Sequence, residues 1–116
     1  MSGTQFYLEH GYSPSTKTTL IHGTDTISVW TPITNNRIIV TDACISTNYA
    51  GTIAFYFDNT TGQKIAEYLL AASATISPVI GAWESTTVSG RIFAKVQTSG
   101  TDGWRVNLTG FEIPSA

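Results

Sequence analysis

Charged residues are scarce in this chain, and the few basic ones are scattered. Charged side chains make up 12% of the 116 residues, and the formal net charge is −2. An average soluble domain carries about 25% charged residues. The sequence offers no basic stripe that would neutralise a nucleic-acid backbone or an anionic membrane. The six basic residues are Lys17, Arg37, Lys64, Arg91, Lys95 and Arg105. We therefore expect neither a nucleic-acid nor a membrane partner.

Cysteine and histidine are almost absent. The single cysteine, Cys44, excludes an intrachain disulfide, and together with His10 and His22 it gives too few ligands for a zinc site. The sequence contains no pattern typical of a nucleophile with its base or of a paired-carboxylate site. We expect no enzyme activity, no catalytic or metal-binding residues and no cofactor. Cys44 lies in an apolar stretch and is predicted to be a small buried hydrophobe.

Long apolar runs are also lacking. No run approaches the roughly 20 residues that span a bilayer. The first residues have neither the basic start nor the apolar stretch of a secretory signal. The sequence therefore indicates a protein made in the cytoplasm, or one from which a signal has been removed.

Residues that favour strands are abundant. Ile, Val and Thr supply 37 of the 116 residues, and their branched side chains suit a pleated sheet. The clearest strand covers residues 51–58, in which Ile53, Phe55 and Phe57 point one way. A polar turn rich in Asn, Thr and Gly follows, and residues 63–70 predict the second strand of a hairpin.

The same alternation recurs at spacings of roughly ten residues, which is typical of a sandwich or barrel. The predicted strands cover residues 18–22, 24–31, 37–47, 51–58, 63–70, 76–80, 90–97 and 104–113. The connections are too short for helical crossovers, so the strands are predicted to be antiparallel. These features favour an all-β protein with a single antiparallel, jelly-roll-like β-sandwich of about eight strands. An immunoglobulin-like sandwich is the alternative.

Two strands depart from simple alternation. Residues 37–47 are apolar at both parities, so this strand is central, buried on both faces, or bulged near Thr41 and Asp42. Gly110 shifts the parity of the last strand, which predicts a bulge there and an inward-facing Phe111 and Ile113.

Residues 1–17 have no sustained period and are predicted to be an N-terminal arm, followed by the sandwich domain at residues 18–116. The arm carries Phe6, Tyr7 and Tyr12, which are unfavourable in water and therefore predict contact with a neighbouring subunit or partner. A partly disordered terminus is the alternative interpretation.

Three tryptophans offer a possible sugar-binding platform. Trp104 shares a face with Val106 and Leu108, which predicts core packing. Trp30 and Trp83 lie near Pro32 and Gly81, so they are the candidate exposed residues for stacking on a sugar.

The order of several segments resembles a known family. A strand with a Thr-Asp pair (residues 37–42) is followed by a Gly-Thr strand with a Gly-containing turn (51–62), by Lys-Ile-Ala-Glu and an Ala-rich loop, and by a final Gly-Trp-Arg-Val-Asn-Leu-Thr-Gly-Phe-Glu segment (103–112). This resembles small all-β virion structural proteins of tailed bacteriophages, found as head decoration and accessory subunits.

The resemblance implies a non-enzymatic homo-oligomer, specifically a homotrimer. It implies a capsid decoration subunit made in the host cytoplasm and located on the capsid exterior. The implied partners are the major capsid protein or other virion proteins. The alternative is a carbohydrate-binding β-sandwich module used for receptor or glycan attachment, with Trp30 and Trp83 as its stacking residues.

Overall fold

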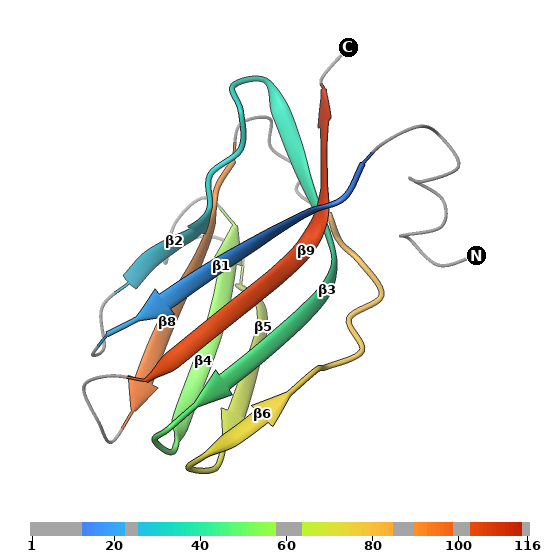
Figure 1. Cartoon of the computed structure of the whole chain (residues 1–116). Helices are drawn as coiled ribbons and strands as arrows, with labels where there is room; N and C mark the ends of the chain where they lie inside the picture. The colour runs from blue at the N-terminus through green and yellow to red at the C-terminus, as the bar shows by residue number, and fades with distance from the viewer. Residues whose placement is uncertain (1–12, 23–25, 58–63, 85–89, 99–102, 115–116) are drawn as a thin grey trace.

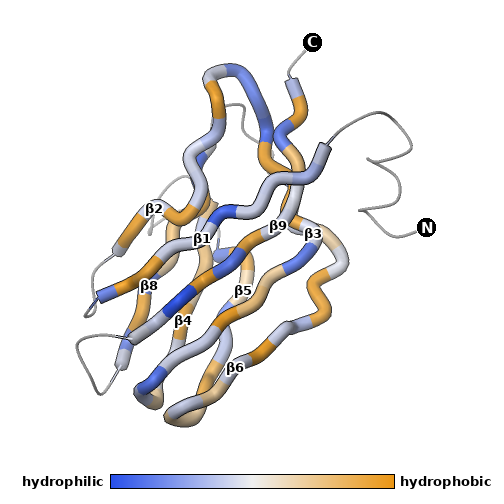
Figure 2. The backbone as a smooth tube through the Cα atoms, viewed as in Figure 1, coloured by the Kyte–Doolittle hydropathy of each residue, from blue (hydrophilic) through white to orange (hydrophobic). Residues whose placement is uncertain are grey.

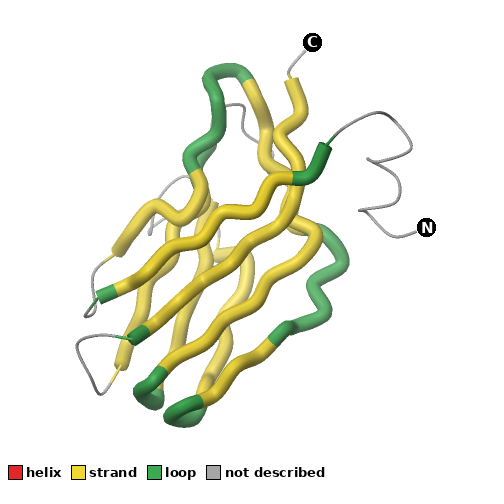
Figure 3. The backbone as a smooth tube through the Cα atoms, viewed as in Figure 1, coloured by secondary structure: helices red, strands yellow, loops and turns green. Residues whose placement is uncertain are grey.

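The computed structural model describes residues 13–22, 26–57, 64–84, 90–98 and 103–114. These residues form nine strands and no helix (Figure 3), and none of them lies in a helix able to cross a membrane. The strands are β1 (Ser15–Ile21), β2 (Thr26–Trp30), β3 (Asn36–Thr47), β4 (Gly51–Phe57), β5 (Lys64–Leu70), β6 (Ala74–Ile76), β7 (Trp83–Glu84), β8 (Ile92–Thr98) and β9 (Trp104–Pro114).

The strands make two antiparallel sheets packed face to face, which confirms the predicted sandwich (Figure 1). One sheet has the order β1-β9-β3-β6, with β7 also paired to β3, and the other has the order β2-β8-β4-β5. The first strand in the sequence pairs with the last described strand, and each following pair is closer together in the sequence. The pairs are β1 with β9, β2 with β8, β3 with β6 and β4 with β5. The chain is therefore one long antiparallel ribbon rolled over on itself, which is the jelly-roll arrangement.

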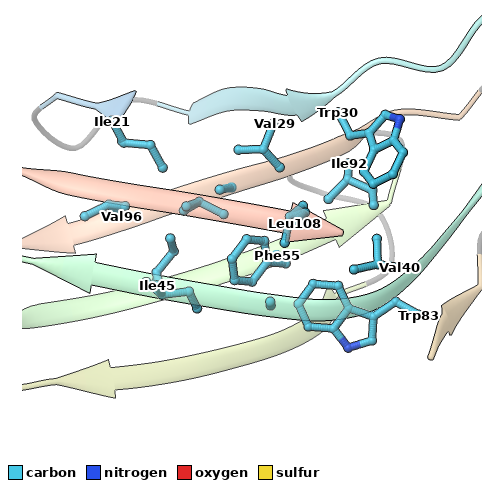
Figure 4. Packing of buried hydrophobic residues seen from close by; sticks show 14 of the residues in the cluster. Ile21, Val29, Trp30, Val40, Ile45, Phe55, Trp83, Ile92, Val96 and Leu108 are labelled. Atoms are coloured by element: carbon cyan, nitrogen blue, oxygen red, sulfur yellow. The ribbon is translucent and has the colours of Figure 1, made fainter. Parts of the chain in front are cut away.

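The core fills the space between the sheets. Ile53, Phe55 and Phe57 of β4 are buried, as the alternation predicts, and they belong to the same cluster as Ile45 and Leu108 of the other sheet. Figure 4 shows Phe55 between the sheets, beside Leu108. Hydrophobic and hydrophilic residues follow one another along the strands (Figure 2) because each strand has one face toward this core. A fully buried side chain of this size contributes about 1.5–3 kcal/mol, so this layer stabilises the fold more than the surface contacts do.

The bulge in the β3–β9 pair lies on β3. Val40 pairs with Gly110 and Asp42 pairs with Thr109, so Thr41 is the extra residue and β9 alternates without interruption. Phe111 is buried, as predicted, but it is not part of the cluster between the sheets. The predicted turn of Phe111 and Ile113 toward the face of Leu108 is therefore wrong. Gly110 matters for a different reason: a Cβ there would collide with the Ile39 carbonyl oxygen and lie 2.8 Å from Val40 Cα.

Several strand limits differ from the prediction. β1 begins at Ser15 rather than residue 18, because an edge strand of Ser, Thr and Lys pairs through its backbone without an apolar pattern. The predicted strand at residues 76–80 lies instead at Ala74–Ile76. The following residues leave the sheet at Pro78, which has no N–H to donate.

Gly110→Ala is expected to lower the free energy of unfolding by about 1–3 kcal/mol, because β3 must shift to admit the methyl group. Urea unfolding followed by tryptophan fluorescence measures the loss. Gln97→Ala, at an exposed position of β8, is the control and should change stability by less than about 0.5 kcal/mol. Equal stability of the Gly110→Ala variant and the parent would contradict the close approach of the two strands.

Candidate interaction surface

The outer face of the β1-β9-β3-β6 sheet is lined by hydroxyl and amide side chains. Thr18 Oγ1 donates to Asn107 Oδ1 at 2.6 Å, and the hydroxyls of Thr16 and Thr109 lie 3.1 Å apart. These pairs lie directly opposite in the β1–β9 register, so cross-strand hydrogen bonds continue the backbone ladder on the surface. The result is a face with many hydroxyl and amide groups, which also carries the exposed Asp42 and Arg105.

A groove of about 480 Å³ opens beside this face. Its floor includes Asp42, Cys44, Asn107 and Thr109, and residues 77–81 form its wall. Half-buried Cys44 lies on this outer face, so its predicted role as a buried core hydrophobe is wrong.

The groove exists because the partner of β3 is interrupted. β6 pairs with residues 45–47 of β3, and β7 pairs with residues 39 and 40. Between them, the described connection swings away from β3 (Figure 1), and Gly81 adopts a φ of 64° in its course. Residues 41–44 of β3 therefore face a gap where a neighbouring strand would otherwise lie.

The groove offers polar groups below an apolar rim. Thr41 Oγ1 lies 3.0 Å from Asp42 Oδ2 and 3.2 Å from the Thr109 carbonyl oxygen, so one hydroxyl proton is shared between these acceptors. Val79 is 101% exposed on the rim. A groove that combines hydroxyl, amide and carboxylate groups with apolar side chains is suited to contact with another polypeptide, which supplies both hydrogen bonds and apolar cover.

The opposite sheet carries a different surface. A hollow of about 160 Å³ lies over Ala54 and is bordered by Tyr56, Lys64 and Lys95. Lys64 Nζ lies 3.6 Å from Glu67 Oε2 and 6.0 Å from the centre of the Tyr56 ring. These contacts are solvent-exposed and stabilise little.

The structure describes two of the five sequence-predicted site residues, Trp30 and Trp83. Phe6, Tyr7 and Tyr12 lie outside the described residues. Trp30 and Trp83 are only 2% and 7% exposed, so neither indole presents a face on which a sugar ring could stack, and their predicted exposure is wrong. Trp104 is buried, as predicted.

The burial of both tryptophans has local causes. Trp30 pairs with Ile92 after a register shift at Val29, and this bulge turns Trp30 toward the core. Trp83 packs against Phe55 with ring centres 5.1 Å apart (Figure 4). Sequence alternation gave no sign of the bulge, because Val29 and Trp30 are both acceptable at either parity of a strand.

Glu112 ties the loop after β2 to the end of β9. Its carboxylate accepts hydrogen bonds from the Trp30 indole N–H at 3.1 Å, the Ile33 backbone N–H at 2.7 Å and the Asn36 amide at 3.3 Å. Burial alone raises the pKa of Glu112, but these three donors and the positive charge of Lys17 outweigh it and hold the pKa below its ordinary value. The ionised carboxylate therefore stabilises the fold.

Within the described ranges, no three His, Cys, Asp or Glu residues cluster in a way that would hold a metal ion. The groove and the face beside it are the candidate site. Sequence reasoning missed the groove because residues 76–80 were predicted to pair as a strand.

No protein-family model matches the chain, and no curated protein sequence matches it. Solved structures with the same fold include a chain from the disulfide-linked pili of Bacillus endospore appendages (12% identity, TM-score 0.53, covering 90% of this chain and 91% of that chain). A chain of the cyanophage Pam1 capsid asymmetric unit also matches (12%, 0.50, 90% and 86%). So does the Drosophila NLP core, described for pentamer formation and histone binding (11%, 0.52, 85% and 97%). At these identities the likeness shows a shared fold.

Glu112→Gln should lower the free energy of unfolding by about 1–2 kcal/mol near pH 7, because charge-assisted hydrogen bonds become neutral ones. The pKa of Glu112 is lower in the folded state than in the unfolded state. The stabilisation is therefore complete above the unfolded pKa and disappears as pH falls through the folded pKa.

Urea unfolding of parent and variant at about pH 7 and about pH 3 tests this, and the two curves should converge at the lower pH. Glu67→Gln removes an exposed carboxylate and is the matched control, with a change below about 0.5 kcal/mol. An equal loss at both pH values would contradict the role of the charge.

Proposed function

We propose that this chain is a structural subunit of a bacteriophage virion, which decorates and stabilises the capsid exterior through protein–protein contacts. It acts without catalysis and without a cofactor, as a homotrimer that binds the major capsid protein or another virion protein. The observation that carries the proposal is the groove between β3 and residues 77–81, where apolar side chains and fully exposed Val79 lie beside hydroxyl, amide and carboxylate groups.

The groove supports this role through its physical chemistry. A partner chain that enters it covers Val79 and finds hydroxyl, amide and carboxylate groups on the floor. Interfaces between separately folded subunits combine an apolar centre with a polar, hydrated surround. The flat row of Thr16, Thr18, Asn107 and Thr109 extends that surround beyond the groove.

The fold comparison is consistent with the proposal. The same sandwich occurs in a cyanophage capsid chain and in a spore pilus subunit, so this architecture is used in extended assemblies. The sequence resemblance to phage head decoration proteins points to the same class of assembly.

The second candidate drawn from the sequence is a carbohydrate-binding module. Its stacking residues, Trp30 and Trp83, are in the core, and sugar recognition by aromatic stacking requires an exposed ring face. The proposal is therefore for contact with protein. A glycan array supplies the direct comparison, and retention of the parent protein by a glycan but not by capsids would favour this candidate.

Val79→Asp should weaken binding to capsids by about tenfold to a hundredfold, because a buried valine contributes about 1.5–3 kcal/mol and a buried unpaired carboxylate adds a further cost. Co-sedimentation of the purified protein with undecorated capsids of the phage that carries the gene measures the affinity. Leu69→Asp is the matched control: Leu69 is 80% exposed on β5 of the other sheet.

Loss of binding in Val79→Asp but not in Leu69→Asp supports the groove as the contact. Failure of the parent protein to bind capsids contradicts the proposed function, and equal loss in both variants contradicts the assignment of the contact to the groove.

The proposed trimer is tested by light scattering of the free protein. The expected mass is three times the 12.5 kDa of one chain. A mass that stays at one chain up to about millimolar concentration, near the weakest end of measurable association, would refute the trimer.

A further inference from the structure

Two large apolar residues are buried on the side of the sheet that faces away from the core. Ile38 and Val40 belong to the core cluster, so Ile39 between them points to the outer face. Phe111 lies directly opposite Ile39 in the β3–β9 register. The cluster between the sheets contains neither residue, yet their exposures are 1% and 0%. Ile39 and Phe111, termed here the outer apolar pair, therefore have a cover other than the core.

The neighbouring strands end beside this pair. β1 begins at Ser15, opposite Gly110, so its backbone ladder stops one residue short of Phe111. The preceding residue, Pro14, is exposed and has no N–H to extend the ladder. On the other side, β7 places Glu84 opposite Ile39 and ends there. The chain thus enters the sheet immediately beside Phe111.

Two segments outside the described residues start at this level. Residues 85–89 (Ser-Thr-Thr-Val-Ser) lie between β7 and β8 in the sequence and contain one apolar residue. The 14 residues before Ser15 reach up to about 46 Å when extended and include Phe6, Tyr7 and Tyr12.

We propose that the outer face of β3 and β9 around Ile39 and Phe111 is the docking site for the N-terminal segment of the same chain, whose aromatic residues cover the outer apolar pair. Removing Phe111 from water together with an arm aromatic relieves the unfavourable exposure of both.

Thiol protection in the full-length chain tests this docking. Cys44 is replaced by Ser, and Ile39→Cys is introduced as the reporter. In this background, Phe6→Ser, Tyr7→Ser and Tyr12→Ser together should accelerate labelling of the reporter by a maleimide at least about tenfold, because local opening replaces a closed contact. Tyr49→Ser, which removes an exposed aromatic on a turn, should leave the rate unchanged.

A second reporter separates docking from general loosening. Val96→Cys lies in the core between the sheets and should label slowly with or without the arm substitutions. No acceleration at Ile39→Cys overturns the proposal. Equal acceleration at both positions also overturns it, since the substitutions would then act on the whole sandwich.

The same reporter identifies the copy that supplies the segment. Protection of Ile39→Cys that stays constant over a hundredfold dilution supports docking within one chain, as proposed. Protection that falls on dilution shows that another copy supplies the segment, and it overturns the intrachain assignment. Neither outcome depends on capsid binding, so failure here is distinct from failure of the proposed function.

Discussion

The antiparallel pairing of β3 with β9 is the interaction on which the sandwich depends. Each strand lies inside its sheet, and the pair extends from Asn36 with Pro114 to Thr47 with Trp104. On one face it supplies Val40, Ile45, Val106 and Leu108 to the core. On the other face it carries the polar row that borders the groove and the outer apolar pair. The one-residue bulge at Thr41 keeps both patterns in register, because it restores core-facing side chains on β3 after Val40.

The outer faces of the two sheets carry different kinds of side chain. The outer face of the β1-β9-β3-β6 sheet has hydroxyl and amide groups, a groove and a protruding valine, whereas the opposite face gathers Lys64, Glu67 and Lys95 around Tyr56. Charged side chains are strongly hydrated and resist burial. The lining of the groove contains one charged residue, Asp42, whereas the lining of the hollow contains three. The proposed contact at the groove therefore removes few charges from water.

The fold was largely predictable from the sequence, and the candidate site was not. The alternation of Ile53, Phe55 and Phe57 predicts a strand with one buried face. The polar segments between the predicted strands are too short for helical crossover connections, so the sandwich follows from local patterns. The errors come from bulges. An extra residue at Val29 turned Trp30 inward. The bulge at Thr41 confirms one of the alternatives predicted for residues 37–47, whereas the second bulge predicted at Gly110 is wrong, because Gly110 pairs with Val40 without an extra residue on β9. A change of parity in one strand does not reveal which of two paired strands holds the extra residue. The groove exists because residues 77–81 do not pair with β3, and this long-range pairing is not encoded in any local sequence pattern.

The roll-up of the ribbon places β9 in the interior of a sheet, between β1 and β3. Residues 104–114 are synthesised after the other described strands, yet they are the shared partner of β1 and β3. A nascent chain on the ribosome therefore holds two strands whose common neighbour is still missing, and contacts between such distant segments form slowly. Completion of the sheet must wait until residues 104–114 have left the ribosome, so the exposed edges of β1 and β3 need protection from other nascent chains during that interval.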